Sequence, residues 1–211
     1  LLSENDIELF LTSERDGYTF YHDDVLYKLM RAQMASNDRL ESIYIYSDIN
    51  GKFVSNYGET DLNRFFDTGW LEDYLAYAGD NSFFYVFRNG SSHFLQPIRI
   101  LSLYKILEHE GSRKGVIVYN IDFGGFVQDL SSLRSEQDSG LSLRRENGEL
   151  VENLWGEAPE EQISVPSRYA SEDYWHDENR IVYRSPVQYT DLYLYSTISW
   201  NGMQSALHEQ Q

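Results

Sequence analysis

Cysteine is absent from the chain, and its absence excludes disulfide bonds, thiolate metal sites and cysteine nucleophiles. Long apolar runs are absent too, since none approaches the roughly 18 to 20 residues that a membrane-spanning helix needs. Positive charge is scarce: 17 Lys and Arg stand against 34 Asp and Glu, and the formal net charge is −17. Because such an acidic surface repels phosphate groups, we expect no binding to nucleic acid.

Motifs of catalysis and metal binding are also missing. The sequence has no Gly-x-Ser-x-Gly elbow, phosphate-binding Gly-Lys-Ser/Thr loop or dinucleotide fingerprint. The acidic pairs Glu160-Glu161 and Glu172-Asp173 lack the loop of a calcium site and are expected to form a solvated face. The histidines are scattered without the spacing of a zinc site, at His22, His93, His109, His176 and His208. We therefore expect no metal, no cofactor and no enzyme activity in this segment.

What the chain does contain is a core-forming composition, 41% hydrophobic and 15% aromatic, and a unit that occurs twice. Each unit opens with alternating apolar residues around Asn-Gly, at 42–56 and at 141–153. This pattern predicts a hairpin with a type I′ turn, because Asn-Gly accepts the positive φ that the turn needs at both central residues. Gly51 and Gly148 are thus expected at equivalent turns.

Each unit also closes in the same way, with a strand that runs into a helical segment at 117–130 and at 194–207. Two openings and two closings in the same order predict a tandem duplication in the α+β class, with the second unit smaller. Apolar residues at helical spacing over the first 40 residues predict a long N-terminal helix, with a break at Gly17 as the alternative. The predicted organisation is this helix, a first unit and a second unit, at 1–40, 41–133 and 134–211.

Further elements are predicted inside both units. After its hairpin, the first unit is expected to contain a helix, three strands and a helix that leaves the sheet, at 69–78, 83–88, 98–105, 115–122 and 123–133. The second is expected to contain four strands around an acidic insert at 156–179, namely 141–146, 149–154, 180–185 and 192–199.

A long helix followed by two PAS-like units of this kind resembles the double Cache (dCache) domain, the extracytoplasmic sensor module of bacterial transmembrane receptors. The resemblance rests on Leu40-Glu-Ser-Ile-Tyr-Ile-Tyr-Ser47 with its Asn-Gly turn, Phe66-Asp-Thr-Gly-Trp-Leu71 and Gly115-Val-Ile-Val-Tyr-Asn-Ile-Asp122. It is strongest towards the sensor segments of Gram-positive histidine kinases and membrane-bound AraC-type regulators. It implies antiparallel sheets, and a place at the cell membrane with this domain outside the cytoplasm.

The resemblance also implies what surrounds the segment. The chain begins at Leu1 rather than at a methionine, so we expect a fragment flanked by membrane helices and followed by a cytoplasmic output domain. A histidine kinase is favoured over a DNA-binding regulator as that output. The long N-terminal segment is expected to pair with a second copy. The Arg-x-Trp-Tyr pattern typical of amino-acid-binding dCache receptors is missing at 66–71, which argues against amino-acid recognition.

A small ligand would, on this resemblance, bind in the membrane-distal unit, between the sheet and the helical insert of residues 57–82. Such pockets are mostly apolar, with a few well-placed polar groups. The predicted walls come from the insert helix and three strands: Trp70, Tyr74, Tyr85, Arg88, Tyr104 and Asp122.

Each of these residues also has an ordinary structural role as its alternative. Trp70 and Tyr74 suit a plain core, Arg88 suits an ion pair with one of the surplus carboxylates, and Asp122 suits a cap on the helix that follows it. Tyr85 and Arg88 have opposite parity on one strand, so a regular strand directs only one of them into the pocket.

Three functions are consistent with this pattern. The segment binds a small ligand, such as a sugar or an organic acid, and signals by shifting its N-terminal helix. Alternatively, it docks an extracellular solute-binding protein, which a filled distal core beside an exposed aromatic patch would favour. The third is a free carbohydrate-binding module, which needs an exposed strip among Trp70, Trp155, Trp175 and Trp200.

Overall fold

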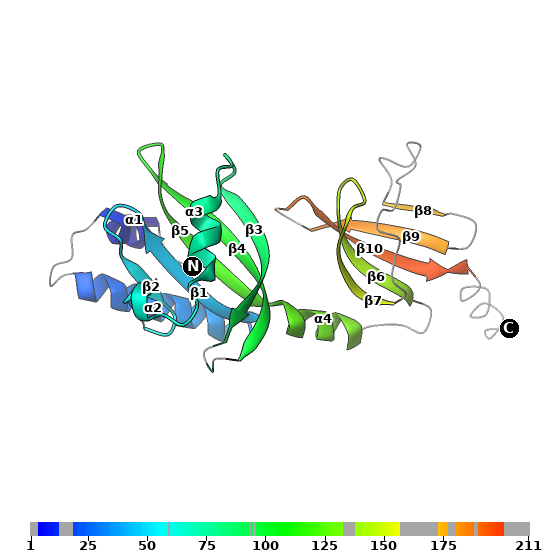
Figure 1. The fold of residues 1–211 in the computed structure, drawn as a ribbon, viewed down its shortest axis with the longest axis horizontal. Coiled ribbons are helices and arrows are strands. Elements are labelled where there is room, and N and C mark those ends of the chain that lie inside the picture. Colours follow the sequence, from blue (N-terminus) through cyan, green and yellow to red (C-terminus); the bar gives the residue numbers. More distant parts are fainter. Residues whose placement is uncertain are drawn as a thin grey trace. The chain divides into compact units, whose positions relative to one another are not determined.

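The computed structural model describes residues 4–12, 19–58, 60–92, 94, 96–132, 138–156, 173–176, 180–187 and 190–200. It divides into two compact units, Leu1–Phe126 and Val127–Gln211, and the division falls inside helix α4 (Phe123–Ser132). Each unit holds one five-stranded antiparallel sheet (Figure 1). The predicted α+β class with two tandem sheet units is therefore confirmed.

The first unit contains helices on both sides of its sheet. Its strand order is β2-β1-β5-β4-β3. Its elements are α1 (Glu4–Thr12), α2 (Thr19–Ala35), β1 (Leu40–Ser47), β2 (Phe53–Ser55), a 3-10 turn (Leu62–Arg64), α3 (Gly69–Ala76), β3 (Phe83–Ser91), β4 (Pro97–His109) and β5 (Ser112–Asp122).

The second unit repeats this topology, with the strand order β7-β6-β10-β9-β8. Its strands are β6 (Asp138–Arg145), β7 (Leu150–Gly156), β8 (Tyr174–His176), β9 (Arg180–Pro186) and β10 (Leu192–Ser199). In both units the opening hairpin pairs with the last strand, as a duplicated unit requires. Strand β8 was not predicted, because its three residues lie within the acidic insert and are too few to show a period.

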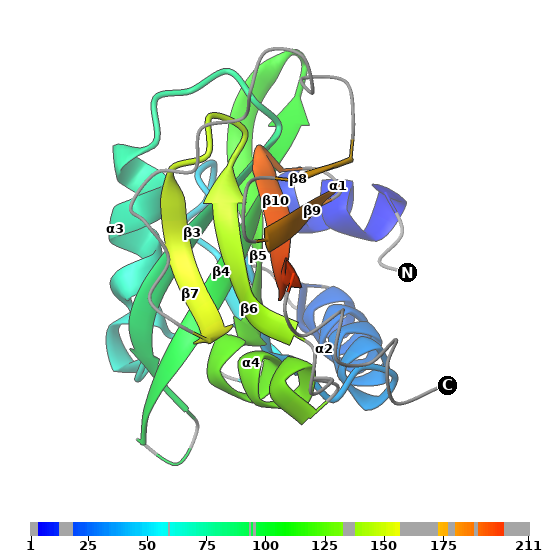
Figure 2. The same ribbon diagram turned by 90° about the vertical axis from the view of Figure 1, so that its right-hand side faces the viewer.

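Helices cover both faces of the first sheet, and the alternation of β1 shows why. Ile43 and Ile45 point to the face covered by α1 and α2, where they join one buried cluster. Tyr44 and Tyr46 point to the opposite face, where they pack in a second, aromatic cluster against α3. Figures 1 and 2 show α3 on one side of this sheet and α2 on the other.

The hairpin turns differ from the prediction in type. Gly51 and Gly148 do have positive φ, 65° and 84°, but within the described residues the only other residue type with positive φ is Glu110. The side chains of Asn50 and Asn147 instead accept a hydrogen bond from the backbone N–H two residues on, at 2.9 and 3.0 Å. These are longer loops that end in a left-handed glycine. The type I′ geometry occurs between β4 and β5, where Glu110 and Gly111 both have positive φ.

The N-terminal segment forms two helices, α1 and α2, rather than one long helix. Gly17, where a break was the alternative, lies outside the described residues. In the described part of the chain, no helix is long and apolar enough to cross a membrane.

Candidate functional site

The aromatic face of the first sheet, beneath α3, is where the predicted ligand site falls. Trp70 and Tyr74 of α3 and Tyr104 of β4 are all 0% exposed. The ring of Trp70 stacks on Phe53 with centroids 5.8 Å apart, and it lies 5.7 Å from the ring of Tyr44. This face is therefore a closely packed aromatic core that α3 closes.

A buried ion pair lies in this aromatic face. Arg88 of β3 donates from Nη1 to Oδ1 of Asp67 and from Nη2 to Oδ2, both at 2.7 Å. The two side chains are 9% and 4% exposed. Burial lowers the pKa of Arg88, but the carboxylate of Asp67 raises it by more, so the guanidinium stays charged. A bidentate pair of this geometry is strong and directional.

Hydrogen bonds extend the ion pair into a closed network across three strands. Arg88 also donates from Nε to Ser102 Oγ at 2.7 Å and from Nη2 to Asn120 Oδ1 at 3.1 Å. Asn120 donates to Ser42 Oγ at 2.8 Å, and Ser42 donates to the hydroxyl of Tyr44 at 2.8 Å. The Tyr44 hydroxyl donates to Asp67 Oδ2 at 2.9 Å and closes the ring. Each member thus fixes the orientation of the next.

Two tyrosine hydroxyls connect α3 to the rest of the unit. Tyr74 donates to Asp48 Oδ2 at 2.6 Å, and Tyr104 donates to Asp73 Oδ2 at 3.1 Å. Burial raises the pKa of both hydroxyls above the usual value, so both stay protonated at neutral pH. Arg113 lies 3.7 Å from the ring centroid of Tyr74 and donates to the Tyr74 carbonyl at 2.6 Å. Helix α3 is thereby tied to the sheet at its C-terminal end.

Two buried donors on this unit make no hydrogen bond. They are Nε1 of Trp70 and Nδ2 of Asn56, and both side chains are 0% exposed. A buried N–H without an acceptor destabilises a fold by about 1 to 3 kcal/mol. Such a group in the predicted site points to a bound acceptor.

The structure brings together four of the six predicted residues, Trp70, Tyr74, Arg88 and Tyr104, on the α3 face. Tyr85 lies on the opposite side of β3, with Phe87, whose ring packs on Phe123 of α4 at 4.9 Å. Strand parity separates Tyr85 from Arg88 in this way.

Asp122 ends β5 beyond the network. Its Oδ1 accepts a hydrogen bond from the backbone N–H of Gly125 at 2.9 Å, which is the geometry of a helix N-cap on α4. A Cβ added at Gly125 would meet both the carboxylate of Asp122 and the guanidinium of Arg39. Asp122 thus has the structural role that was its alternative.

Sequence reasoning missed most members of the polar network: Ser42, Tyr44, Asp67, Ser102 and Asn120. A signal for three of them exists. Ser42, Ser102 and Asn120 occupy inward positions of otherwise apolar strands, and the strand register sets them side by side. Asp67 gives no such signal, because it comes from a loop and meets Arg88 only in the folded chain.

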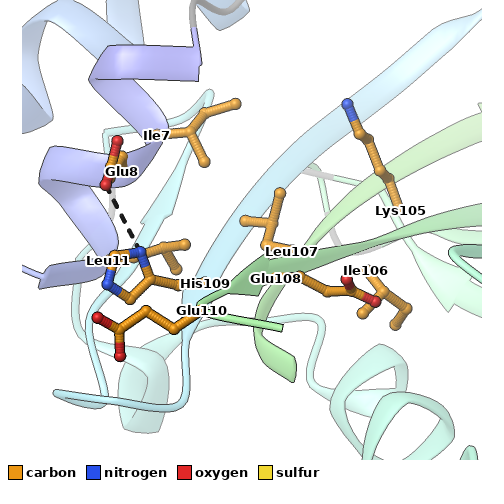
Figure 3. Close-up of a pocket in the computed structure, with 9 residues that line it drawn as sticks. All are labelled: Ile7, Glu8, Leu11, Lys105, Ile106, Leu107, Glu108, His109 and Glu110. Atoms are coloured by element: carbon orange, nitrogen blue, oxygen red, sulfur yellow. Dashed lines mark ion pairs between the residues drawn. The ribbon is translucent and has the colours of Figure 1, made fainter. Parts of the chain in front are cut away.

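A separate pocket of about 370 Å³ lies against α1 and the end of β4, and contains none of the six predicted residues. Its apolar floor includes Ile7, Leu11 and Leu107. His109 Nδ1 and Glu8 Oε1 lie 3.5 Å apart across it and link β4 to α1 (Figure 3). The pocket therefore adjoins the N-terminal helix rather than α3.

The tryptophans do not favour a carbohydrate-binding strip. Trp70 and Trp175 are buried, Trp155 is half-buried, and Trp200 is 44% exposed. Among the residues that the structure describes, no group of three or more His, Asp or Glu side chains is placed to hold a metal ion.

No protein-family model matches the chain, and no curated protein matches it in sequence. Solved structures do match it in fold. The extracellular domain of vpHK1S-Z8, a protein assigned as a histidine kinase, has a TM-score of 0.53 at 12% identity, over 96% of this chain and 85% of that one.

Two chemoreceptor domains match in the same way. The ligand-binding domain of PctB from Pseudomonas aeruginosa PAO1, in complex with L-Arg, has a TM-score of 0.56 at 15% identity, over 98% of this chain and 84% of that one. That of CtaA from Pseudomonas fluorescens, in complex with L-leucine, has a TM-score of 0.51 at 15% identity, over 94% and 84%. The chain therefore has the fold of extracellular sensor and ligand-binding domains, as its resemblance to dCache domains predicted.

Proposed function

We propose that this segment is the extracytoplasmic sensory domain of a bacterial transmembrane receptor, and that a small molecule binds beneath α3 in the first unit. The segment supplies signal input and no catalysis. The proposal rests on the shared fold with sensor domains and on the polar network buried in the aromatic face.

The observation that carries the ligand site is the buried ion pair of Asp67 and Arg88. Charged groups are rarely placed in an aromatic core for stability alone, because desolvation offsets most of their attraction. Arg88 lies next to the start of α3, where a Cβ added at Gly69 would be 3.8 Å from its Nη1. Movement of α3 therefore opens the pair to a ligand while the sheet stays fixed.

The chemistry of the site favours a ligand rich in acceptor oxygens. Trp70 Nε1 and Asn56 Nδ2 are donors, and the guanidinium of Arg88 carries donors only. Sugars and organic acids present such oxygens. Amino acids do as well, and the PctB and CtaA domains were solved with amino acids bound. We place sugars and organic acids first, because this chain lacks the Arg-x-Trp-Tyr pattern.

Binding is expected to signal through α3 and the opposite face of the same sheet. The ligand stabilises one arrangement of α3, and the sheet connects this face to α1 and α2 on the other side. Differential affinity for the two arrangements supplies the free energy of the shift. The output is a cytoplasmic domain beyond a membrane helix. A histidine kinase of a Gram-positive bacterium is our first choice, and a membrane-bound AraC-type regulator the second.

The test is a thermal-shift screen of the chain against sugars, organic acids, amino acids and nucleobases. A ligand at 100 times its Kd stabilises the folded state by about 2.7 kcal/mol and raises the melting temperature. We expect Trp70→Phe to abolish the shift, because it keeps the ring but removes the indole N–H. Tyr85→Phe, on the other face, is expected to leave the shift unchanged. A hit that survives Trp70→Phe and Arg88→Met argues against this site.

Docking of a solute-binding protein is the second candidate, and one observation favours it. The core beneath α3 is closely packed, while Leu75 of α3, Phe83 and Phe94 are 62%, 48% and 82% exposed. Exposed apolar side chains of this size suit a protein interface. This candidate predicts no small-molecule hit in the screen, and capture of a ligand-loaded solute-binding protein that Leu75→Ser weakens.

Self-association is part of the proposal. The intact receptor pairs with a second copy through its N-terminal helices, and membrane tethering strengthens a weak contact. Sedimentation at high concentration is expected to show a dimer in equilibrium with the monomer. A monomer at all concentrations contradicts pairing by this segment alone.

A further inference from the structure

The second unit has a polar and aromatic sheet face of its own. Tyr195 of β10 lies between Ser142 of β6 and Arg184 of β9 in the strand register, and Arg144 lies beside Tyr193 one step along. Because side chains two residues apart share a face, all five point to the same side of the sheet (β6, β9 and β10 in Figure 1). None of them belongs to the α3 site.

Tyr195 is the unusual member of this face. Its side chain is 0% exposed, and its hydroxyl is a buried polar group without a hydrogen-bond partner. Trp175 packs edge-on against its ring at 5.9 Å and is itself 3% exposed. A buried hydroxyl that forms no hydrogen bond is rare in native proteins, and each instance calls for an explanation.

Two guanidinium groups flank this hydroxyl. Arg144 is 0% exposed, with Cζ 5.9 Å from the ring centroid of Tyr195, and Arg184 has its Cζ 5.5 Å over the ring of Tyr193. Arg144 is held in place by hydrogen bonds from Nε to Ser142 Oγ at 3.0 Å and from Nη1 to the Gly148 carbonyl at 2.8 Å. Burial raises the pKa of Tyr195, and the charges of Arg184 and Arg144 oppose that rise. Both positive charges therefore act on the phenol oxygen.

We propose that this face of the second unit is an oxyanion site, in which Tyr195 Oη and the guanidinium groups of Arg144 and Arg184 hold a carboxylate or a phosphate group of a small solute. All three groups are donors, so the occupant must present acceptors. Arginine forks match the paired oxygens of both groups. A net charge of −17 repels anions from most of the surface, which makes an internal pair of arginines selective for a solute that enters.

The experiment is calorimetric titration of the whole chain with inorganic phosphate and, separately, with malonate, at constant ionic strength. We expect saturable binding of at least one probe with one site per chain. If phosphate alone binds, the site takes phosphate groups, and if malonate alone binds, it takes carboxylates. Binding of both identifies a general oxyanion site.

Three variants test the assignment. Tyr195→Phe removes only the partnerless hydroxyl, so the melting temperature without ligand is expected to stay or rise, while the affinity falls by roughly tenfold as one hydrogen bond to a charged group is lost. Arg184→Gln is expected to weaken binding by at least a similar factor. Arg145→Gln is the matched control, since Arg145 is the next residue on β6 and pairs with Asp191 at 2.7 Å at the surface.

Two results would overturn the oxyanion site. One is the lack of saturable binding of either probe to the unaltered chain. The other is an equal loss of affinity in Arg145→Gln and Arg184→Gln, which indicates non-specific binding of anions at surface charges. Trp70→Phe is expected to leave anion binding unchanged, so failure here is separate from failure of the α3 site.

Discussion

Neutralising Asp67 is the perturbation that best tests how the α3 site is held together. The carboxylate accepts two hydrogen bonds at 2.7 Å from Arg88 and one at 2.9 Å from Tyr44. In Asp67→Asn the side chain keeps its size, but its amide group turns a donor towards the donors of Arg88. The guanidinium then stays buried without its counter-charge. Breaking one partner of a buried ion pair lowers the free energy of unfolding by about 3 to 5 kcal/mol.

A matched control lies in the same unit. Asp24 pairs with Lys28 at 2.6 Å on the surface of α2, with the two side chains 51% and 69% exposed. Asp24→Asn is expected to lower the free energy of unfolding by no more than about 0.5 kcal/mol, because exposed helix pairs contribute little. The contact distances of the two pairs are nearly equal, so burial is the variable that the comparison isolates.

The assay is urea unfolding followed by tryptophan fluorescence. Trp70 is the only tryptophan between residues 1 and 126, and it packs against Tyr44 in the site, so a variant with phenylalanine at the other three tryptophans reports on the first unit alone. A loss below about 1 kcal/mol for Asp67→Asn, the range of an exposed pair, would refute the reasoning. Combining it with Arg88→Met is expected to cost less than the sum of the single changes, because the double variant leaves no uncompensated charge.

Three further predictions concern neighbouring groups. Burial raises the pKa of Tyr104, so the folded state keeps this proton above pH 10 while the unfolded state loses it; stability is expected to fall as the pH rises beyond about 10, by up to about 1.4 kcal/mol per pH unit, and Tyr104→Phe should make this slope shallower in urea unfolding at pH 9, 10 and 11. An unchanged slope would place the titration elsewhere. Asp122→Ala removes the cap on the Gly125 N–H and is expected to lower stability by about 1 kcal/mol without changing ligand affinity, whereas Asp122→Asn keeps the cap; a selective loss of affinity instead would return Asp122 to the ligand site. Gly115→Ala sets a methyl group against the backbone carbonyl of Tyr46, and we expect a loss of about 1 to 3 kcal/mol, with an unaltered urea midpoint as the contrary result.

The fold could be predicted from local patterns because both units announce themselves in short-range sequence. Alternation at Ile43, Tyr44 and Ile45 marks a strand covered on both faces, and the order of the segments sets the sheet topology. The turn type could not be predicted in the same way. Asn50 stays in the negative-φ region, since its side chain bonds to the backbone of Lys52 and closes a longer loop.

The site was predicted only where one residue carries its own signal. Trp70, Tyr74, Arg88 and Tyr104 stand out by type and spacing, and they do share a face. Their polar partners do not stand out, because the network depends on strand register and on a loop contact between residues 21 positions apart. A carboxylate such as Asp67 is one of 34 acidic residues, and only folding selects it.

Hydrogen–deuterium exchange with and without a ligand found in the screen tests the central claim most directly. The claim is that a small molecule binds between α3 and the sheet of the first unit. The account predicts slower exchange in the ligand complex over 57–82 and over β3, with the effect lost in Trp70→Phe. Protection confined to the second unit, or to the pocket at α1 and β4, would contradict it.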